Sequence, residues 1–244
     1  MTVIGRVHSF DVSTGVDGPG TRFVAFLAGC PLRCQYCHSP DTWFRRSGRP
    51  MTDDELMTEI GHYERFLKVA HGGVTLSGGE ALQQPDFVRE IFTRCREKGI
   101  HTALDTSGFL GDKADDALLD VTDLVLLDIK AGDEDTYARV TRTGRLEPTL
   151  RFADRLAARG TKIWIRFVLV PGLTDSVKNV ELVAEHAASI PTVERVEVLP
   201  FHRLGAAKYQ ALNEPFPLAE TPAPTPELLE RVRAQFRAHG LTVF

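Results

Sequence analysis

Six short apolar runs, rich in β-branched or aromatic residues, alternate along the chain with segments of helical pattern. These predicted strands are 22–27, 74–77, 101–105, 124–129, 163–170 and 193–199. Repeated strand–helix alternation is typical of an α/β fold, in which a parallel sheet carries its helices on the outside. The pattern does not decide whether the sheet closes. An N-terminal segment that contains residues 5–10 precedes the first run.

The helix ends are marked by capping and stop residues. Thr52 and Glu55 have the spacing of a capping box, which predicts a helix directly after Thr52. A second helix is expected to start at Pro85 and to stop before Gly99. Further helices are predicted over 112–119, 147–159, 176–189 and 225–239. Five prolines between 214 and 226 predict an extended strap across the sheet edge before the last helix.

Length and composition favour one domain spanning residues 1–244. A chain of 244 residues with 43% hydrophobic composition can bury a full core, and no break in composition divides it. The first residues do not resemble a secretory signal, and no apolar run approaches the length of a membrane span. We therefore expect a cytoplasmic protein without a membrane partner. A net charge of −4 argues against general binding of nucleic acid.

Three of the four cysteines, Cys30, Cys34 and Cys37, lie within eight residues. This spacing offers three thiolates to one metal centre, whereas a [4Fe–4S] cluster has four irons to hold. One iron would therefore keep an open coordination position that can bind a small molecule. Catalytic zinc sites have an open position for the same reason. The alternative is a structural zinc site that includes His38. Two observations argue against zinc. Cys37 and His38 are adjacent, so they can hardly both bind one tetrahedral ion. The sequence also offers no second pair of ligands, because the remaining cysteine, Cys95, stands alone in a helical pattern.

Polar residues follow five of the predicted strands, at the end where ligands collect in parallel α/β folds. The first strand leads into the cysteines and the second into a Gly-Gly-Glu sequence. The polar residues after the other strands are Asp105 and Thr106, then Asp128 and Lys130, then His202. Each has an ordinary alternative: a Gly-Gly turn, an aspartate that caps a helix, or a surface histidine. Their agreement on one edge of the sheet favours a shared site.

The roles of Arg166 and of a run of three arginines stay open between two or more interpretations. Arg166 interrupts an apolar strand, so it needs an anionic partner, unless it faces water at a sheet edge or pairs with a structural carboxylate. Arg45, Arg46 and Arg49 form a basic run that is either a solvated loop or a docking surface for an acidic electron carrier. Cys95 is interpreted as a small buried apolar residue.

The Cys-x3-Cys-x2-Cys motif with Tyr36 inside it, followed one strand later by Gly78-Gly79-Glu80, resembles the radical S-adenosylmethionine superfamily. Within it, the chain resembles the family that activates glycyl-radical enzymes. The further segments that carry this resemblance are 18–22, 41–43, 104–106, 123–130, 164–166 and 199–202. The resemblance covers 3–244, and the implied fold is a partial (β/α)6 TIM-like barrel, open on one side.

The resemblance also implies roles for individual residues. Cys30, Cys34 and Cys37 would be catalytic as the ligands of a [4Fe–4S] cluster whose fourth iron binds S-adenosylmethionine. The residues implied around S-adenosylmethionine are Tyr36, Cys37, His38, Gly78, Gly79, Asp105, Asp128, Ile129, Lys130, Arg166 and His202. Asp105, Thr106 and Asp128 would hold Na+ or K+, and Asp17 would contact the peptide substrate.

The implied reaction is the installation of a glycyl radical on formate acetyltransferase (pyruvate formate-lyase) under anaerobic conditions. Reduced flavodoxin or ferredoxin would supply one electron, and S-adenosylmethionine would be cleaved to methionine and a 5′-deoxyadenosyl radical. The chain lacks the ferredoxin-like cysteine insertion of several related activases, which favours the formate-lyase type. The alternatives are activation of another glycyl-radical enzyme, radical chemistry on a small molecule, or a zinc-stapled interaction module without activity. The protein is expected to act as an oxygen-sensitive monomer.

Overall fold

The computed structural model describes residues 2–244 and divides them into two compact units. The first comprises residues 2–30, 42–106 and 112–126, and the second comprises 31–41, 107–111 and 127–244. Strand β6 (Leu124–Asp128) runs from the first unit into the second. The strand order is β3-β1-β2-β4-β5 in the first unit, continuing into β6, and the second unit continues through β7 to β8. Strands of a mostly parallel sheet that alternate with helices confirm the predicted α/β fold.

The first unit contains both antiparallel and parallel strands. Strand β1 (Ile4–Thr14) pairs antiparallel with β2 (Thr21–Leu27) and with β3 (Arg49–Thr52). β2 then pairs parallel with β4 (Gly73–Gly78), and β4 pairs parallel with β5 (His101–Thr106). The parallel strands match the predicted runs within two residues. Strand β3 was not expected, because a four-residue edge strand with a proline has little sequence signature.

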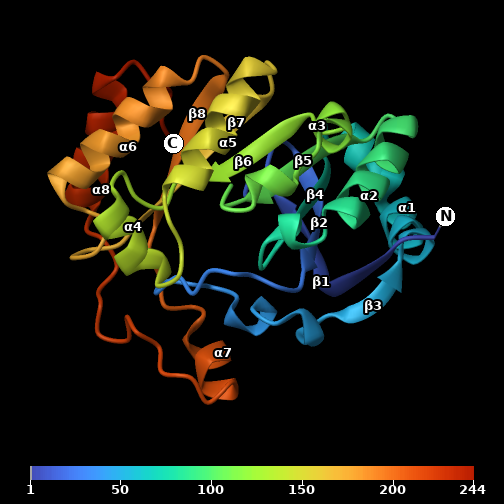
Figure 1. The fold of residues 1–244 in the computed structure, drawn as a ribbon, viewed down its shortest axis with the longest axis horizontal. Helices are drawn as coiled ribbons and strands as arrows, with labels where there is room; N and C mark the ends of the chain where they lie inside the picture. Colours follow the sequence, from blue (N-terminus) through green and yellow to red (C-terminus); the bar gives the residue numbers. More distant parts are fainter. Residues whose placement is uncertain (1) are drawn as a thin grey trace. The chain divides into compact units, whose positions relative to one another are not determined.

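Helices α1 (Asp53–Val69) and α2 (Pro85–Glu97) pack against β2, β4 and β5 (Figure 1). The capping box at the start of α1 is confirmed, since Glu55 N donates to Thr52 Oγ1 over 3.1 Å and Thr52 N donates to Glu55 Oε2 over 2.7 Å. The predicted helix 112–119 is a shorter α3 (Asp116–Asp120) that follows a 3-10 turn, Gly111–Lys113. The other 3-10 turns are Pro40–Thr42, Arg45–Ser47 and Ala81–Gln83.

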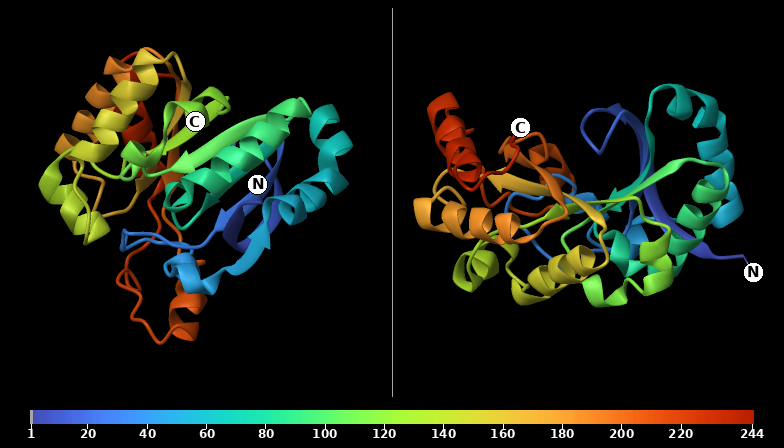
Figure 2. Two further views of the ribbon diagram at one scale, coloured as in Figure 1. Left: turned by 45° about the vertical axis from the view of Figure 1, so that its right-hand side comes forward. Right: turned by 90° about the horizontal axis from the view of Figure 1, so that it is seen from above.

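The second unit is built on the parallel pair β7 (Lys162–Leu169) and β8 (Val193–Pro200) (Figure 2). Its helices are α4 (Glu134–Thr141), α5 (Glu147–Ala158), α6 (Val177–Ser189), α7 (Ala206–Ala211) and α8 (Pro226–Ala238). α6 lies beside α8, and Phe167 of β7 meets Phe236 of α8 with ring centroids 5.7 Å apart. Helices α4 and α7 were not predicted from the sequence.

The outer edge of β8 is occupied by the last residues of the chain. Val196 N donates to Thr242 O over 2.8 Å, and Phe244 N donates to Val196 O over 2.9 Å. The proline-rich segment 214–226 is the one predicted to cross a sheet edge as a strap. In the structure, Phe216 and Leu218 of that segment pack with Val170 and Phe201 in an apolar cluster. Among residues 2–244, no helix is long and apolar enough to cross a membrane.

Candidate functional site

Cys30 follows the carboxyl end of β2, in the first unit. Its N–H donates to Trp43 O over 3.0 Å, and the neighbouring Gly29 N–H donates to Thr42 O over 2.7 Å. Gly29 O in turn accepts from Glu80 N over 2.8 Å, just after β4. The predicted convergence of strand ends is therefore present in this unit, and it fixes the backbone around Cys30.

Gly78 and Gly79 are required by close backbone packing. Gly78 has a φ of +118°, and a Cβ atom there would lie 2.2 Å from Leu27 N. A Cβ atom on Gly79 would lie 2.5 Å from Gly29 O. Gly79 N also donates to Leu27 O over 2.8 Å. These glycines let β4 turn sharply against β2, which is a structural reason for the Gly-Gly pair in addition to any approach of a ligand.

The polar groups at the ends of β4 and β5 bind one another. Ser77 Oγ donates to Asp105 Oδ2 over 2.5 Å, and Thr106 Oγ1 donates to Glu80 Oε1 over 2.6 Å. Glu80 Oε1 also accepts from Leu82 N over 3.1 Å, so this buried carboxylate caps a 3-10 turn. Asp105 and Thr106 are thus held in place by hydrogen bonds with neighbouring residues: Asp105 accepts one, and Thr106 donates one.

Asp17 lies at the other end of these strands. Arg22 is opposite Gly73, and Leu27 is opposite Gly78, so the loop before β2 is at the amino-terminal end of the parallel pair. Ser13 Oγ donates to Asp17 Oδ2, and Thr75 Oγ1 donates to Asp17 O, both over 2.7 Å. Arg22, which is fully buried, donates from Nε to Thr75 Oγ1 over 2.9 Å. Substrate contact by Asp17 stays a prediction.

Cys34 and Cys37 belong to the second unit, where Cys37 N donates to Cys34 O over 3.1 Å. Beyond β6, Lys130 Nζ lies 3.1 Å from Asp128 Oδ2 and 5.7 Å from the centre of the Tyr36 ring. Ile129, between them, is fully buried. The predicted residues after β6 therefore lie against the cysteine loop. Among residues 2–244, the buried hydroxyl of Tyr36 has no hydrogen-bond partner.

The protonation states of Cys34, Tyr36 and Lys130 follow from their burial and from the charges beside them. Burial raises the pKa of the Cys34 thiol to about 12, and Lys130 partly offsets this effect. Burial raises the pKa of Tyr36 well above its ordinary value. For Lys130, burial opposes the charge, but Asp128, Tyr36 and Cys34 raise its pKa well above the ordinary value. Lys130 therefore keeps its charge, and burial keeps the Cys34 thiol protonated in spite of that charge.

His38 and His202 form an edge-to-face pair with ring centroids 5.0 Å apart. Burial, and then His202 and Lys208, lower the pKa of His38. The segment after β8 continues along the cysteine loop. Lys208 Nζ lies 3.2 Å from Asp41 Oδ1, and a Cβ atom on Gly205 would lie 3.2 Å from Cys37 O. Sequence reasoning found the histidines but missed this support, because no pattern in 203–211 indicates a partner.

Arg166 has an anionic partner within the protein. Its Nε lies 3.5 Å from Glu197 Oε2, and both residues are only 8% exposed. Glu197 also accepts from Arg195 over 2.5 Å, and the Arg195 guanidinium lies 3.3 Å from the centre of the Trp164 ring. The structure therefore shows the structural carboxylate that the sequence left as an alternative. Glu197 could have been found as a lone charge between Val196 and Val198.

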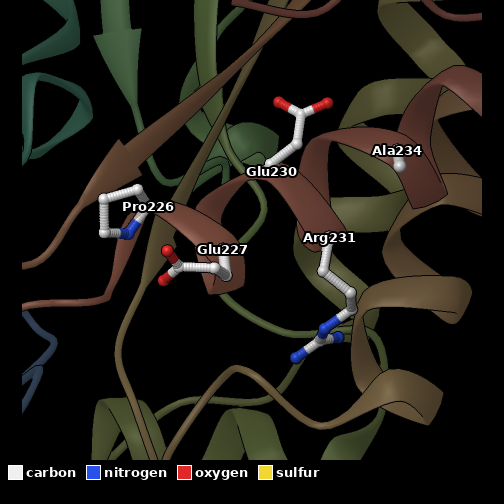
Figure 3. A pocket seen from close by; sticks show the side chains of 5 residues that line it. All are labelled: Pro226, Glu227, Glu230, Arg231 and Ala234. Atoms are coloured by element: carbon white, nitrogen blue, oxygen red, sulfur yellow. The ribbon is translucent and has the colours of Figure 1, made fainter.

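A shallow pocket lies on α8 and is lined by Pro226, Glu227, Glu230, Arg231 and Ala234 (Figure 3). It contains none of the predicted site residues. Arg231 is used in packing, because its NH2 group donates to Asp175 O over 2.6 Å and its NH1 group donates to Gln235 Oε1 over 2.7 Å. The pocket is open and formed by one helix face, so it does not compete with the strand ends as the candidate site.

Comparison with known proteins gives concordant results. Residues 24–182 match the radical SAM superfamily model. The chain is 43% identical over 242 residues to a pyruvate formate-lyase 1-activating enzyme from Escherichia coli (strain K12), covering 98% of each chain. It is 44% identical over 223 residues to a pyruvate formate-lyase-activating enzyme from Clostridium pasteurianum, covering 91% of this chain and 92% of that one.

Among solved structures, a domain of a pyruvate-formate lyase-activating enzyme from Bacteroides vulgatus ATCC 8482 has a TM-score of 0.59 at 28% identity. The match covers 71% of this chain and 98% of that one. The superfamily model matches well over half of the sequence, and the identities to full-length relatives exceed 40%. The chain therefore belongs to the radical SAM superfamily and, within it, to the pyruvate formate-lyase activating enzymes.

Proposed function

We propose that this protein activates formate acetyltransferase by generating a glycyl radical on it under anaerobic conditions. The observation that carries the proposal is the near full-length similarity to curated pyruvate formate-lyase activating enzymes, at 43% identity over 98% of the chain. The bound cofactors would supply one-electron cleavage of S-adenosylmethionine to methionine and a 5′-deoxyadenosyl radical, which abstracts a hydrogen atom from a glycine Cα of the partner.

The cysteines fit a [4Fe–4S] cluster by their chemistry. Cys30, Cys34 and Cys37 supply three sulfur ligands and the motif contains no fourth cysteine, as expected where one iron binds a substrate. Burial raises the pKa of Cys34, so its thiolate would form when a bound metal ion displaces the proton, which leaves to solvent. We propose these three residues as the cluster ligands.

The second unit offers groups that suit S-adenosylmethionine. The Lys130 ammonium, which Asp128 orients, would face a carboxylate, and the buried Tyr36 hydroxyl has spare hydrogen-bonding capacity in the described chain. His38 and His202 would line the adenine side, and Ile129 would contribute its backbone and apolar surface. Arg166 would face the carboxylate or the peptide while Glu197 fixes its guanidinium.

The first unit would contribute backbone and carboxylate groups. Gly78 and Gly79 would present their main chain to the methionine ammonium, and Asp105 would accept a hydrogen bond from it. We also propose that Asp105, Thr106 and Asp128 bind Na+ or K+, and that Asp17 contacts the substrate peptide. Flavodoxin or ferredoxin would be the electron donor, and the enzyme would act as a cytoplasmic monomer.

Electron paramagnetic resonance tests the proposal. The anaerobically reconstituted protein is incubated with S-adenosylmethionine, dithionite and formate acetyltransferase, in parallel with other glycyl-radical enzymes. The expected result is a glycine-centred doublet that appears with formate acetyltransferase and depends on S-adenosylmethionine. A doublet with a different partner alone would reassign the substrate, and no doublet with any partner would refute the activity.

A further inference from the structure

Four exposed arginines, Arg6, Arg45, Arg46 and Arg49, come from strand β1 and from the segment 44–49, which also carries the exposed Phe44, and are called here the arginine patch. β1 and β3 bring Arg6 to the backbone of this segment, since Arg6 is opposite Pro50 and donates from NH1 to Gly48 O over 3.5 Å. The Arg46 guanidinium lies 4.4 Å from the centre of the Phe44 ring, which is 40% exposed. A chain with a net charge of −4 thus carries a concentrated positive surface here.

Within residues 2–244, none of these four guanidinium groups takes part in a salt bridge. Arg49 approaches Met51 Sδ at 4.0 Å, and it contributes weakly to lowering the pKa of Glu55, after the hydrogen bonds from Thr52. Exposed arginines are ordinarily just solvated, so charge alone does not make a site. The combination with an exposed aromatic ring is more specific, because aromatic and arginine residues dominate the centres of protein interfaces.

The backbone of the arginine patch lies next to the backbone of Cys30. Ala28 N donates to Arg6 O over 2.9 Å, and Cys30 N donates to Trp43 O over 3.0 Å. Gly48 packs so closely that a Cβ atom there would lie 2.7 Å from Ala28 Cβ. The backbone that carries the patch is therefore bonded directly to the backbone of Cys30. A protein docked on the patch would lie beside a proposed cluster ligand.

We propose that the arginine patch is the docking surface for an acidic one-electron carrier protein. The inference rests on the proposed function and adds the place where the donor binds. The donor is oxidised by one electron, the cluster on Cys30, Cys34 and Cys37 is reduced by it, and no bond or proton is exchanged. Carboxylates around the donor's cofactor complement the four arginines and steer the encounter, while Phe44 provides an apolar contact beside Arg46.

The test compares two double variants that remove the same charge. Arg45→Gln/Arg46→Gln alters the patch, and Arg65→Gln/Lys178→Gln removes two exposed positive charges elsewhere. Reduction of the reconstituted cluster is followed by stopped-flow absorbance, with photoreduced flavodoxin at low and high salt, and with dithionite. We expect the patch variant to be reduced about tenfold more slowly by flavodoxin at low salt, with a weakened salt dependence. Dithionite should reduce all three proteins at the same rate.

Equal flavodoxin rates for the patch variant and the wild type at low salt would overturn the proposal. It is also overturned if the patch variant keeps its flavodoxin rate but loses affinity for formate acetyltransferase in a titration, because the surface would then belong to the protein substrate. Failure of the proposed function is distinguished separately. In that case the cluster of the wild type would be reduced normally, but no glycyl radical would form when the protein is incubated with dithionite, S-adenosylmethionine and formate acetyltransferase.

Discussion

Glu197 and Arg166 face each other across the pair of strands β7 and β8, with Oε2 of the carboxylate 3.5 Å from Nε of the guanidinium. The other carboxylate oxygen accepts from Arg195 over 2.5 Å. Arg195 in turn lies between the rings of Trp164 and Phe244, at 3.3 and 4.7 Å from their centres. One buried carboxylate therefore pairs with two arginines, and the ring of Phe244 lies against one of them, Arg195.

Glu197→Gln should destabilise the protein by about 3 kcal/mol, because it leaves the buried Arg166 without its anion. The free energy of unfolding is measured on the cluster-free protein by urea denaturation followed by far-UV circular dichroism. Glu194→Gln is the matched control on the same strand. Glu194 binds Lys162 Nζ over 2.9 Å and Trp164 Nε1 over 3.0 Å at a more exposed position, so its loss should cost at most about 1 kcal/mol. Equal losses would contradict the inferred role of Glu197.

Gly78→Ala should destabilise the cluster-free protein, whatever the glycine does for a ligand. An added Cβ would lie 2.2 Å from Leu27 N, and the backbone conformation is one that alanine adopts only at a cost. We expect a loss of more than about 2 kcal/mol in urea denaturation. Gly160→Ala is the control, because Gly160 also has a positive φ, +74°, but an added Cβ meets nothing within 4 Å. Similar losses for the two variants would show that crowding by β2 is unimportant.

The strands and capped helices were predictable because their signals are local. The parallel strands are apolar runs, and α1 starts at a capping box that Thr52 and Glu55 form as expected. Helix α8 follows Thr225, whose side chain accepts from Leu228 N over 3.2 Å. Strand β3 and helix α7 were missed because each is short and owes its place to tertiary contacts.

The site was predictable in its residue types and less so in its contacts. Polar residues do follow β4, β5, β6 and β8, and Lys130 does approach Tyr36. A linear sequence does not show which charge meets which, so the pairing of Arg166 with Glu197 stayed open. Likewise, a Gly-Gly pair carries no sign of whether a ligand or a neighbouring strand requires it.

Asp53 should make the stability of the first unit depend on pH in the acid range. Burial opposes its charge, but hydrogen bonds from the Val3 and Asp53 N–H groups and from Arg94 lower its pKa below the ordinary 3.8. A lowered folded-state pKa means that the stabilisation is complete above 3.8 and is lost as the pH falls through the folded value. Asp53→Asn should therefore cost about 1–3 kcal/mol at pH 7, and less at progressively lower pH.

Urea denaturation of the wild type and of Asp53→Asn between pH 7 and pH 3 measures this difference. Asp54→Asn is the matched control, since Asp54 binds the same Arg94 NH1 atom at 2.8 Å with a side chain that is 73% exposed. Its loss should be under about 1 kcal/mol. A gap between wild type and Asp53→Asn that stays constant over this pH range would be incompatible with a lowered pKa of Asp53.

Cys34→Ala should abolish assembly of the iron–sulfur cluster and leave the fold largely intact. The two remaining motif cysteines would hold too few irons, whereas the far-UV circular dichroism spectrum should be nearly unchanged. Iron and sulfide are determined after anaerobic reconstitution. Cys95→Ala is the matched control. Cys95 is fully buried in α2, and burial raises its pKa to about 12. The Cys95→Ala variant should therefore bind iron like the wild type and lose only roughly 1 kcal/mol in stability. Wild-type iron content in Cys34→Ala, or zinc without sulfide in the wild type, would remove the basis for the cluster assignment.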